Sequence, residues 1–372
     1  MRVLSVQLRD FRTYARAEAA LGPGLTVVHG PNGAGKSNLL EALYFGCTGR
    51  SPRTRNEREL ISFGAQAARV VVRGSEGAQG HELSVAYGVG PDGERGVKRM
   101  TADGAAVERL LDVDFRPLLS VFEPDRLELL KGPPAVRRAH LDQVVTAIWP
   151  LRASDRREYS RVLAQRNALL ARIRTGRASN GTLGAWDREL ATAALAVRDH
   201  RASAVELLAE PFAQRAAQLG LDGDAALDYR PRSRATDVDE FVAELQAKLA
   251  SDLERGFSGH GPHRDELAIL RDGRELRLYG SQGEQRLALL ALLLAERAVL
   301  ARERRRTPLM LLDDVMSELD SQRRELLAAE LSADGQSVIA TTDLAHVPGA
   351  GDACVTRLRV SPGTILQEAL AA

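Results

Sequence analysis

Cysteine and long apolar stretches are both scarce in this 372-residue chain. The two cysteines, Cys47 and Cys354, lie far apart in the sequence, and neither is near other residues spaced as metal ligands. This argues against a disulfide framework and a zinc site. The longest apolar run, Leu287 to Ala295, is about half the length of a membrane span. Charges already interrupt the first ten residues, so we expect no leader, no membrane partner and a cytoplasmic location.

An excess of one charge sign is also missing, because 51 Lys+Arg residues face 50 Asp+Glu residues and leave a net charge of +1. No global field therefore attracts a polyanion, and any such site must be local. Aromatic residues make up only 4% of the chain, so Leu, Val and Ala must build the core. With 44% hydrophobic and 27% charged residues, the composition is typical of a soluble protein, and the length predicts two or three structural units.

A glycine-rich segment follows the apolar run Leu25 to Val28, which we expect to be a buried strand, and precedes a helix-like sequence. It matches the phosphate-loop pattern G-x-x-x-x-G-K-[ST] in full. In this pattern backbone N–H groups and the following helix N-terminus face phosphate oxygens, the lysine reaches the β- and γ-phosphates, and the hydroxyl binds Mg²⁺. The pattern predicts an ATP site formed by Gly30, Pro31, Asn32, Gly33, Ala34, Gly35, Lys36 and Ser37.

A second apolar run, Leu309 to Leu312, ends in two acidic residues. A carboxylate at the tip of a buried strand is costly unless a cation meets it, so we expect Asp313 to bind Mg²⁺ together with Ser37. Asp314 is the candidate that orients or deprotonates the attacking water. The alternative is a strand that ends in a turn with two solvated acids.

The long apolar helix expected from about Gly283 opens with Ser281 and Glu284 in a capping-box spacing. Capping alone would explain the serine. Gly283 is a poor helix former within a first turn, which indicates a further reason for a small residue there. These two residues, Ser281 and Gly283, are the candidates for a second part of the nucleotide site.

The chain divides into three segments by amino-acid composition and pattern. Residues 1-142 and 258-372 alternate between strand-like and helix-like sequence, whereas 143-257 is rich in Ala, Leu, Arg and Glu and reads as several helices. We therefore predict one α/β head assembled from both chain ends and an inserted helical arm.

Several stretches resemble one protein family. Ser281 and Gly283 stand in the same order as the serine and glycine of the signature motif of the ABC-type ATPases, ahead of the strand that ends at Asp313. Other stretches resemble the branch of these ATPases that contains the SMC proteins and the RecF family. Asp10–Tyr14 with Gly35–Ala42 resembles the SMC, Rad50 and RecF branch as a whole. The stretches that resemble the RecF family are Pro124–Asp125, Leu129–Pro134, Arg137–Asp142, Gly261–Leu267 and Leu312–Asp320.

This resemblance implies an ABC-type P-loop ATPase head with an inserted α-helical arm domain, using ATP and Mg²⁺. It also implies an ATP-dependent homodimer in which Ser281 and Gly283 of one copy cap the γ-phosphate held by the other. It further implies weak, DNA-stimulated ATPase activity and binding to duplex DNA and single-strand/double-strand junctions. The family acts with RecR and RecO and helps RecA replace single-strand-binding protein at gaps.

The sequence departs from the pattern at several positions. His140 stands where the family more often has an aromatic residue, and Gly280 where transporter-type signatures have leucine. No glutamine is evident at Glu123-Pro124, and no histidine follows the strand Val338 to Thr341. The sensing role of the switch histidine found after this strand in other ABC-type ATPases would therefore fall to Thr341, Thr342 or Asp343.

Two clusters of arginine are candidates for contacts to DNA phosphates, although a solvated surface is the more common explanation for each. A third run of arginines indicates a solvated helix end, whose dipole the cations complement. The absence of interleaved aromatic residues favours contacts to a duplex backbone. The clusters are Arg50, Arg53, Arg55 and Arg58; Arg152, Arg156, Arg157 and Arg161; and Arg302, Arg304, Arg305 and Arg306.

Two other functions share this nucleotide chemistry. The ATPase subunit of a membrane transporter is one, although the helical insert and the residues Leu312 to Asp320 argue against it. A short SMC-like structural DNA tether is the other, although the helical block has room for only about a hundred residues where a tether needs several hundred.

Overall fold

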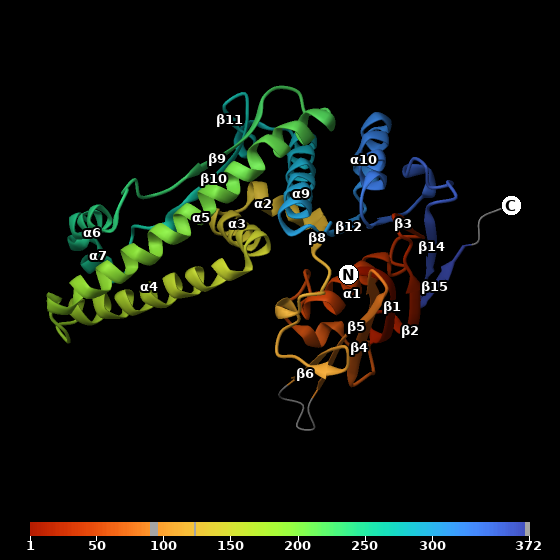
Figure 1. Ribbon diagram of the computed structural model, residues 1–372, viewed down its shortest axis with the longest axis horizontal. Helices are drawn as coiled ribbons and strands as arrows, with labels where there is room; N and C mark the ends of the chain where they lie inside the picture. Colours follow the sequence, from red (N-terminus) through yellow and green to blue (C-terminus); the bar gives the residue numbers. More distant parts are fainter. Residues whose placement is uncertain (90–95, 123, 369–372) are drawn as a thin grey trace. The chain divides into compact units, whose positions relative to one another are not determined.

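The computed structural model describes residues 1–89, 96–122 and 124–368, and the chain forms two compact units (Figure 1). The first unit consists of Met1–Pro124 and Arg306–Ala372, and the second of Asp125–Arg305. The first unit is therefore built from both chain ends, as the sequence predicted.

A mainly parallel sheet forms one half of the first unit. Its strand order is β15-β14-β3-β13-β12-β8, in which β15 alone pairs antiparallel. Val- and Leu-rich runs form the central strands because both of their faces are buried. The strands are β3 (Leu25–His29), β8 (Leu119–Phe122), β12 (Leu309–Asp313), β13 (Ser337–Thr341), β14 (Thr356–Ser361) and β15 (Thr364–Gln367).

An antiparallel sheet forms the other half, in the order β2-β1-β4-β5-β6-β7. Helix α1 (Lys36–Thr48) packs against strands of both sheets, and Leu39, Leu43 and Phe45 lie in the shared core with Val70 and Val85. The strands of the antiparallel sheet are β1 (Arg2–Phe11), β2 (Tyr14–Ala20), β4 (Ala67–Glu76), β5 (Gln79–Val89), β6 (Gly96–Ala102) and β7 (Ala105–Ala106), and helix α10 (Ser321–Ala333) completes the unit.

Helices dominate the second unit, as the sequence predicted for its central part. Helix α5 packs along α4 and against α9, and the apolar run of α9 is buried (Figure 1). Among the described helices, none has both the length and the apolar character to span a membrane. The helices are α2 (Glu128–Lys131), α3 (Pro134–Ile148), α4 (Ala153–Arg174), α5 (Leu183–Gln218), α6 (Val238–Ala247), α7 (Leu249–Arg255), α8 (Leu276–Tyr279) and α9 (Gln282–Arg304).

A small sheet in this unit contains a strand that the sequence analysis missed. Strand β9 (Ala225–Arg230) lies within residues 143-257, which the sequence analysis read as several helices, and it pairs antiparallel with β10 (Glu266–Arg271). Strand β11 (Arg274–Glu275) pairs antiparallel with β10 and forms a hairpin around Asp272-Gly273. The sequence of β9 is short and its pairing partner is remote along the chain, so neighbouring residues alone did not indicate a strand.

The limits of the units also differ from the predicted segments 1-142, 143-257 and 258-372. Helix α3 and residues 258–305 belong to the second unit because α3 and α9 pack on α5. The long apolar face of α9 thus completes a helical core, whereas the sequence analysis assigned it to the α/β head.

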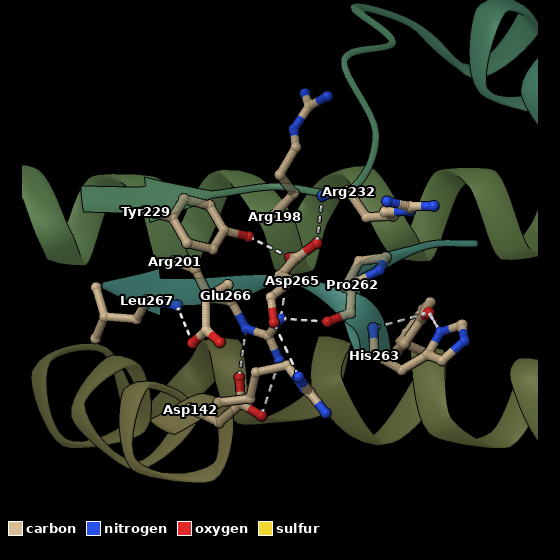
Figure 2. A network of polar contacts seen from close by, with 12 residues as sticks. Asp142, Arg198, Arg201, Tyr229, Arg232, Pro262, His263, Asp265, Glu266 and Leu267 are labelled. Carbon is tan, nitrogen blue, oxygen red and sulfur yellow. Dashed lines mark hydrogen bonds and ion pairs between the residues drawn. The ribbon is translucent and has the colours of Figure 1, made fainter. Parts of the chain in front are cut away.

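Buried charges join the elements of the second unit (Figure 2). Arg201 of α5 donates to Asp142 Oδ1 at 2.8 Å, to Asp265 Oδ2 at 3.1 Å and to the Pro262 carbonyl at 2.7 Å. The Tyr229 hydroxyl of β9 donates to the same Asp265 carboxylate. The stretch Gly261–Leu267, which resembled the RecF family, therefore connects α3, α5 and β9.

Candidate nucleotide-binding site

The phosphate loop connects the end of β3 to the start of α1. Gly30, Gly33 and Gly35 have φ of 153°, 78° and 116°, a region that favours glycine. A Cβ at Gly30 would lie 2.2 Å from the Val360 carbonyl oxygen, and one at Gly35 would lie 2.8 Å from the Tyr14 hydroxyl oxygen. The buried Tyr14 hydroxyl also donates to the Gly35 carbonyl at 2.9 Å. These two glycines are thus required by backbone conformation and by close packing.

The N-terminus of α1, whose N-cap is Gly35, has no side-chain cap within the described structure, as is also true of α3, α4 and α5. Asp237, Ser281 and Asp320, by contrast, cap α6, α9 and α10 with side-chain oxygens. The first N–H groups of an uncapped helix can bind an anion, which the helix dipole also favours.

Lys36 holds the loop from within. Its side chain is buried, and Nζ donates to the Gly30 carbonyl at 2.8 Å and to the Pro31 carbonyl at 3.0 Å. Burial lowers the pKa of Lys36, and the charges of Asp314 and Asp313 partly offset this effect. An ammonium group has three N–H donors, so one remains for a phosphate oxygen.

Asp313, the last residue of β12, and Asp314, which follows it, lie at the same edge of the sheet as the phosphate loop, because β3, β13 and β12 are adjacent and parallel. Burial raises the pKa of Asp313, against a hydrogen bond from Ser37 and the positive charge of Arg53. Asp314 adopts a φ of 51°, and its buried Oδ1 has no hydrogen-bond partner among the described residues. The structure thus brings together the predicted residues Lys36, Ser37, Asp313 and Asp314.

This donor set fits Mg²⁺ and a nucleotide triphosphate. A buried carboxylate oxygen without a partner is costly unless a cation or water satisfies it, and Asp314 Oδ1 is such an atom. Asp313 and the Ser37 hydroxyl are hard oxygen donors of the kind that Mg²⁺ accepts alongside phosphate oxygens. The uncapped helix and Lys36 supply the matching sites for the phosphates.

A network of arginines around the buried Glu41 was not found from the sequence. Arg12 donates twice to Glu41 of α1, at 2.9 and 2.7 Å, and Arg53 reaches the same carboxylate at 3.4 Å. Arg53 was grouped with possible DNA contacts, but it lies near Asp313. The available signal was Glu41 itself, an acid among apolar residues on the helix that follows the phosphate loop.

The segment after β13 engages most of its polar groups locally. The Thr341 hydroxyl donates to the Asp343 carbonyl at 3.0 Å, and the Asp343 carboxylate accepts from the Ala345 N–H at 2.9 Å. His346, which the sequence analysis did not single out, lies in the next turn with a buried Nδ1 that has no partner among the described residues. Glu123 lies outside the described residues, so the position where a glutamine was sought remains undescribed.

The other predicted site residues, Ser281 and Gly283, belong to the second unit. Ser281 Oγ accepts from the Glu284 N–H at 3.3 Å, and Glu284 accepts from the Ser281 N–H at 2.7 Å, which confirms the capping box. A Cβ at Gly283 would meet no described atom within 4 Å. Packing within the described chain therefore gives no reason for glycine at this position.

Comparisons with known proteins agree with this architecture. Residues 2–356 match the RecF/RecN/SMC N-terminal domain family. The chain is 34% identical to the DNA replication and repair protein RecF of Heliobacterium modesticaldum, covering 93% of both chains. It is 38% identical to the protein of that name from Streptomyces avermitilis, covering 98% of this chain and 99% of the relative. The chain belongs to the RecF family.

Solved structures give the same result. A RecF described as a recombination mediator protein of the RecFOR pathway, in an ATP form, superposes with a TM-score of 0.86 at 26% identity, covering 99% of this chain and 98% of the other. An SMC head bound to a domain of ScpA reaches a TM-score of 0.61 at 17% identity and shares the fold. The fold is therefore that of an ABC-type P-loop ATPase head with a helical arm, and the transporter subunit and the tether are not favoured.

Proposed function

We propose that this protein is an ATP-dependent DNA-binding protein of recombinational repair and replication restart. The observation that carries the proposal is the phosphate loop, where Lys36 and the uncapped α1 face the partnerless carboxylate oxygen of Asp314 at one sheet edge. The relatives are named DNA replication and repair proteins, which supports DNA as the partner.

Each residue of the site has a role in this proposal. The N–H groups of residues 30–37 and Lys36 hold the β- and γ-phosphates. Ser37 and Asp313 hold Mg²⁺, which neutralises phosphate charge when bound. Asp314 orients the attacking water and accepts its proton at Oδ1. The expected result is weak ATPase activity that DNA stimulates.

ATP-dependent dimerisation would explain why residue 283 is a glycine, which packing within the described chain does not explain. In a homodimer, Ser281 and Gly283 of one copy approach the γ-phosphate bound by the other, and the open space around Gly283 admits that phosphate. The capping box presents the N-terminus of α9 toward the same anion.

The partners follow from the family. A solved relative is described as a recombination mediator protein of the RecFOR pathway, so we assign RecR and RecO as partners and RecA loading at single-strand gaps as the outcome. We also place the protein in the cytoplasm, where its substrate DNA is found.

Sedimentation velocity tests the proposal directly. The wild type should be a monomer alone, a dimer with Mg-ATP, and should sediment with duplex DNA when ATP is present. Ser281→Arg should block the dimer and leave ATP binding intact, whereas Ser179→Arg, at an exposed loop position in the same unit, should dimerise normally. A wild type that binds ATP but neither dimerises nor binds DNA would overturn the proposal.

A further inference from the structure

A row of arginines crosses the antiparallel sheet of the first unit. Arg9 of β1 lies directly opposite Arg16 of β2 and directly opposite Arg69 of β4. Arg69 lies opposite Ala86 of β5, which in turn lies opposite Arg99 of β6. Directly opposite residues share a face, so Arg9, Arg16, Arg69 and Arg99, here called the arginine row, line one face across five strands.

This face points away from α1. Leu8 and Val70, the neighbours of Arg9 and Arg69 along their strands, are buried in the core, and strand side chains alternate between the two faces. All four arginines of the row are exposed. Five strands at about 4.8 Å spacing give the row a length of roughly 19 Å.

The arginine row has little negative charge to balance it. Arg9 meets Asp10 at 3.9 Å, and Arg69 bonds to the Ser84 hydroxyl at 3.1 Å. Arg16 and Arg99 make no hydrogen bond or ion pair within residues 1–89, 96–122 and 124–368. Like charges placed directly opposite each other are unfavourable in a sheet, so an anion that bridges them would relieve the repulsion.

The acids nearby are engaged elsewhere. Glu82 pairs with Arg73 at 2.9 Å, and Glu18 accepts from Gln7 at 3.1 Å. A hollow of about 920 Å³ is lined by Arg9, Arg16 and Arg69 of the row and also by Thr364, Ile365 and Leu366 of β15. The arginine row therefore faces a space large enough for part of an extended anion.

An exposed aromatic residue lies in a turn bonded to the end of β1, beside Arg9. Phe63 is fully exposed at the tip of a turn in which the Ala65 N–H donates to the Ser62 carbonyl at 3.0 Å and Gly64 has a φ of 84°. The Ser62 N–H donates to the Asp10 carbonyl at 2.8 Å, next to Arg9. Phe63 is thus held at the ends of the strands that carry the row.

We propose that the arginine row binds the sugar-phosphate backbone of a DNA strand and that Phe63 stacks on an unpaired base of the same DNA. This inference rests on the proposed function and names the surface that performs it. Guanidinium groups suit phosphate oxygens because their N–H donors form a fork, and an exposed ring stacks on any base. A regular row of cations beside an aromatic residue favours nucleic acid over an acidic protein, whose charges lack this spacing.

The test measures DNA affinity by fluorescence anisotropy with Mg-ATP at several salt concentrations. The DNAs are a blunt duplex, a single strand and a duplex with a single-strand overhang. The row variant carries Arg9→Gln, Arg16→Gln and Arg69→Gln. Its control carries Arg109→Gln, Arg323→Gln and Arg324→Gln, which removes the same charge from the first unit at residues that do not line the hollow.

The row variant should bind all three DNAs at least tenfold more weakly than the control variant. The slope of log K against log salt should fall by about 2 to 3, because three phosphate contacts are lost. Its melting temperature and its stabilisation by ATP should be retained, since the substitutions are exposed and relieve repulsion. A row variant with the affinity and salt slope of the control would overturn the inference.

Phe63→Ala should weaken binding to single-strand and overhang DNA about tenfold and leave the blunt duplex unchanged. Phe63→Tyr should restore binding, because the tyrosine ring stacks equally well. If Phe63→Ala binds all three DNAs normally, the stacking role is wrong and a protein contact takes its place. A wild type that binds none of the DNAs with ATP would instead refute the proposed function.

Discussion

The two units of the chain bury charged side chains in different ways. In the second unit Arg201 is bonded to the carboxylates of Asp142 and Asp265. Arg166 is bonded to Asp187, Asp252 and Ser258 through Nε and Nη1, although its Nη2 has no partner among the described residues. In the first unit the described partners of Lys36 are loop carbonyls, and Asp314 Oδ1 has no partner among the described residues. A buried charge bonded to opposite charges marks a scaffold, whereas a carboxylate oxygen without a cation at a sheet edge marks a ligand site.

The comparison predicts where substitutions will harm folding and where they will harm binding. Removing one member of a complete pair leaves an uncompensated buried charge, so stability falls. Removing a member of the incomplete set chiefly weakens the ligand-bound state.

Arg201→Ala should have the largest effect on folding. It leaves buried Asp265 without its cation and Asp142 with only the half-exposed Arg156, which should cost about 3–5 kcal/mol in the free energy of unfolding. Urea unfolding measures the loss. Arg188→Ala, on the same helix but in an exposed ion pair with Asp239, should cost about 1 kcal/mol or less. Equal losses from the two variants would show that burial of the pair does not matter.

His140→Phe tests a departure from the family pattern. His140 Nε2 lies 2.5 Å from Glu296 Oε1 of α9, and both side chains are buried. Phenylalanine would leave Glu296 without its partner, at a cost of about 2–3 kcal/mol. The double variant His140→Phe with Glu296→Leu should recover most of this loss in thermal unfolding. If the double variant is as unstable as the two single losses added together, the residues are not coupled.

Lys36→Ala should change the unfolding free energy of the nucleotide-free protein by about 1 kcal/mol or less and abolish stabilisation by ATP. Wild type at ATP concentrations near 100 times its Kd should gain about 2.7 kcal/mol, which thermal melts would show as a rise of several degrees. A Lys36→Ala variant that gains the same rise would remove the phosphate-loop assignment.

Asp313→Asn should have the smallest effect on the stability of the nucleotide-free protein, and it should raise that stability rather than lower it. Burial raises the pKa of Asp313, so its charged form costs stability. Relative to the asparagine variant, the wild type should therefore lose stability as pH rises above the ordinary Asp pKa of about 4 and through the raised value. The two proteins should melt alike at acid pH, and the variant should melt higher at neutral pH but respond less to Mg-ATP. A variant that melts lower at neutral pH would contradict the assigned burial cost.

Local patterns were enough to predict the phosphate loop, the strand before Asp313 and the capping box at Ser281. Each depends on residues that are neighbours in sequence, so spacing carries the information. The Arg12–Glu41 pair, strand β9 and the arginine row depend on contacts between distant segments, and only the strand register reveals the row. The unit limits were misplaced because the apolar face of α9 does not show which partner covers it.

Mixing two inactive variants tests the account most directly. The Lys36→Ala variant keeps Ser281 and Gly283 unchanged, and the Ser281→Arg variant keeps the phosphate loop unchanged. Alone, each should remain monomeric with Mg-ATP in sedimentation velocity. Mixed, they should form a dimer that holds one complete site, with the loop from one copy and the turn from the other. A mixture that stays monomeric while the wild type dimerises, or a Ser281→Arg variant that dimerises alone, would contradict the shared nucleotide site.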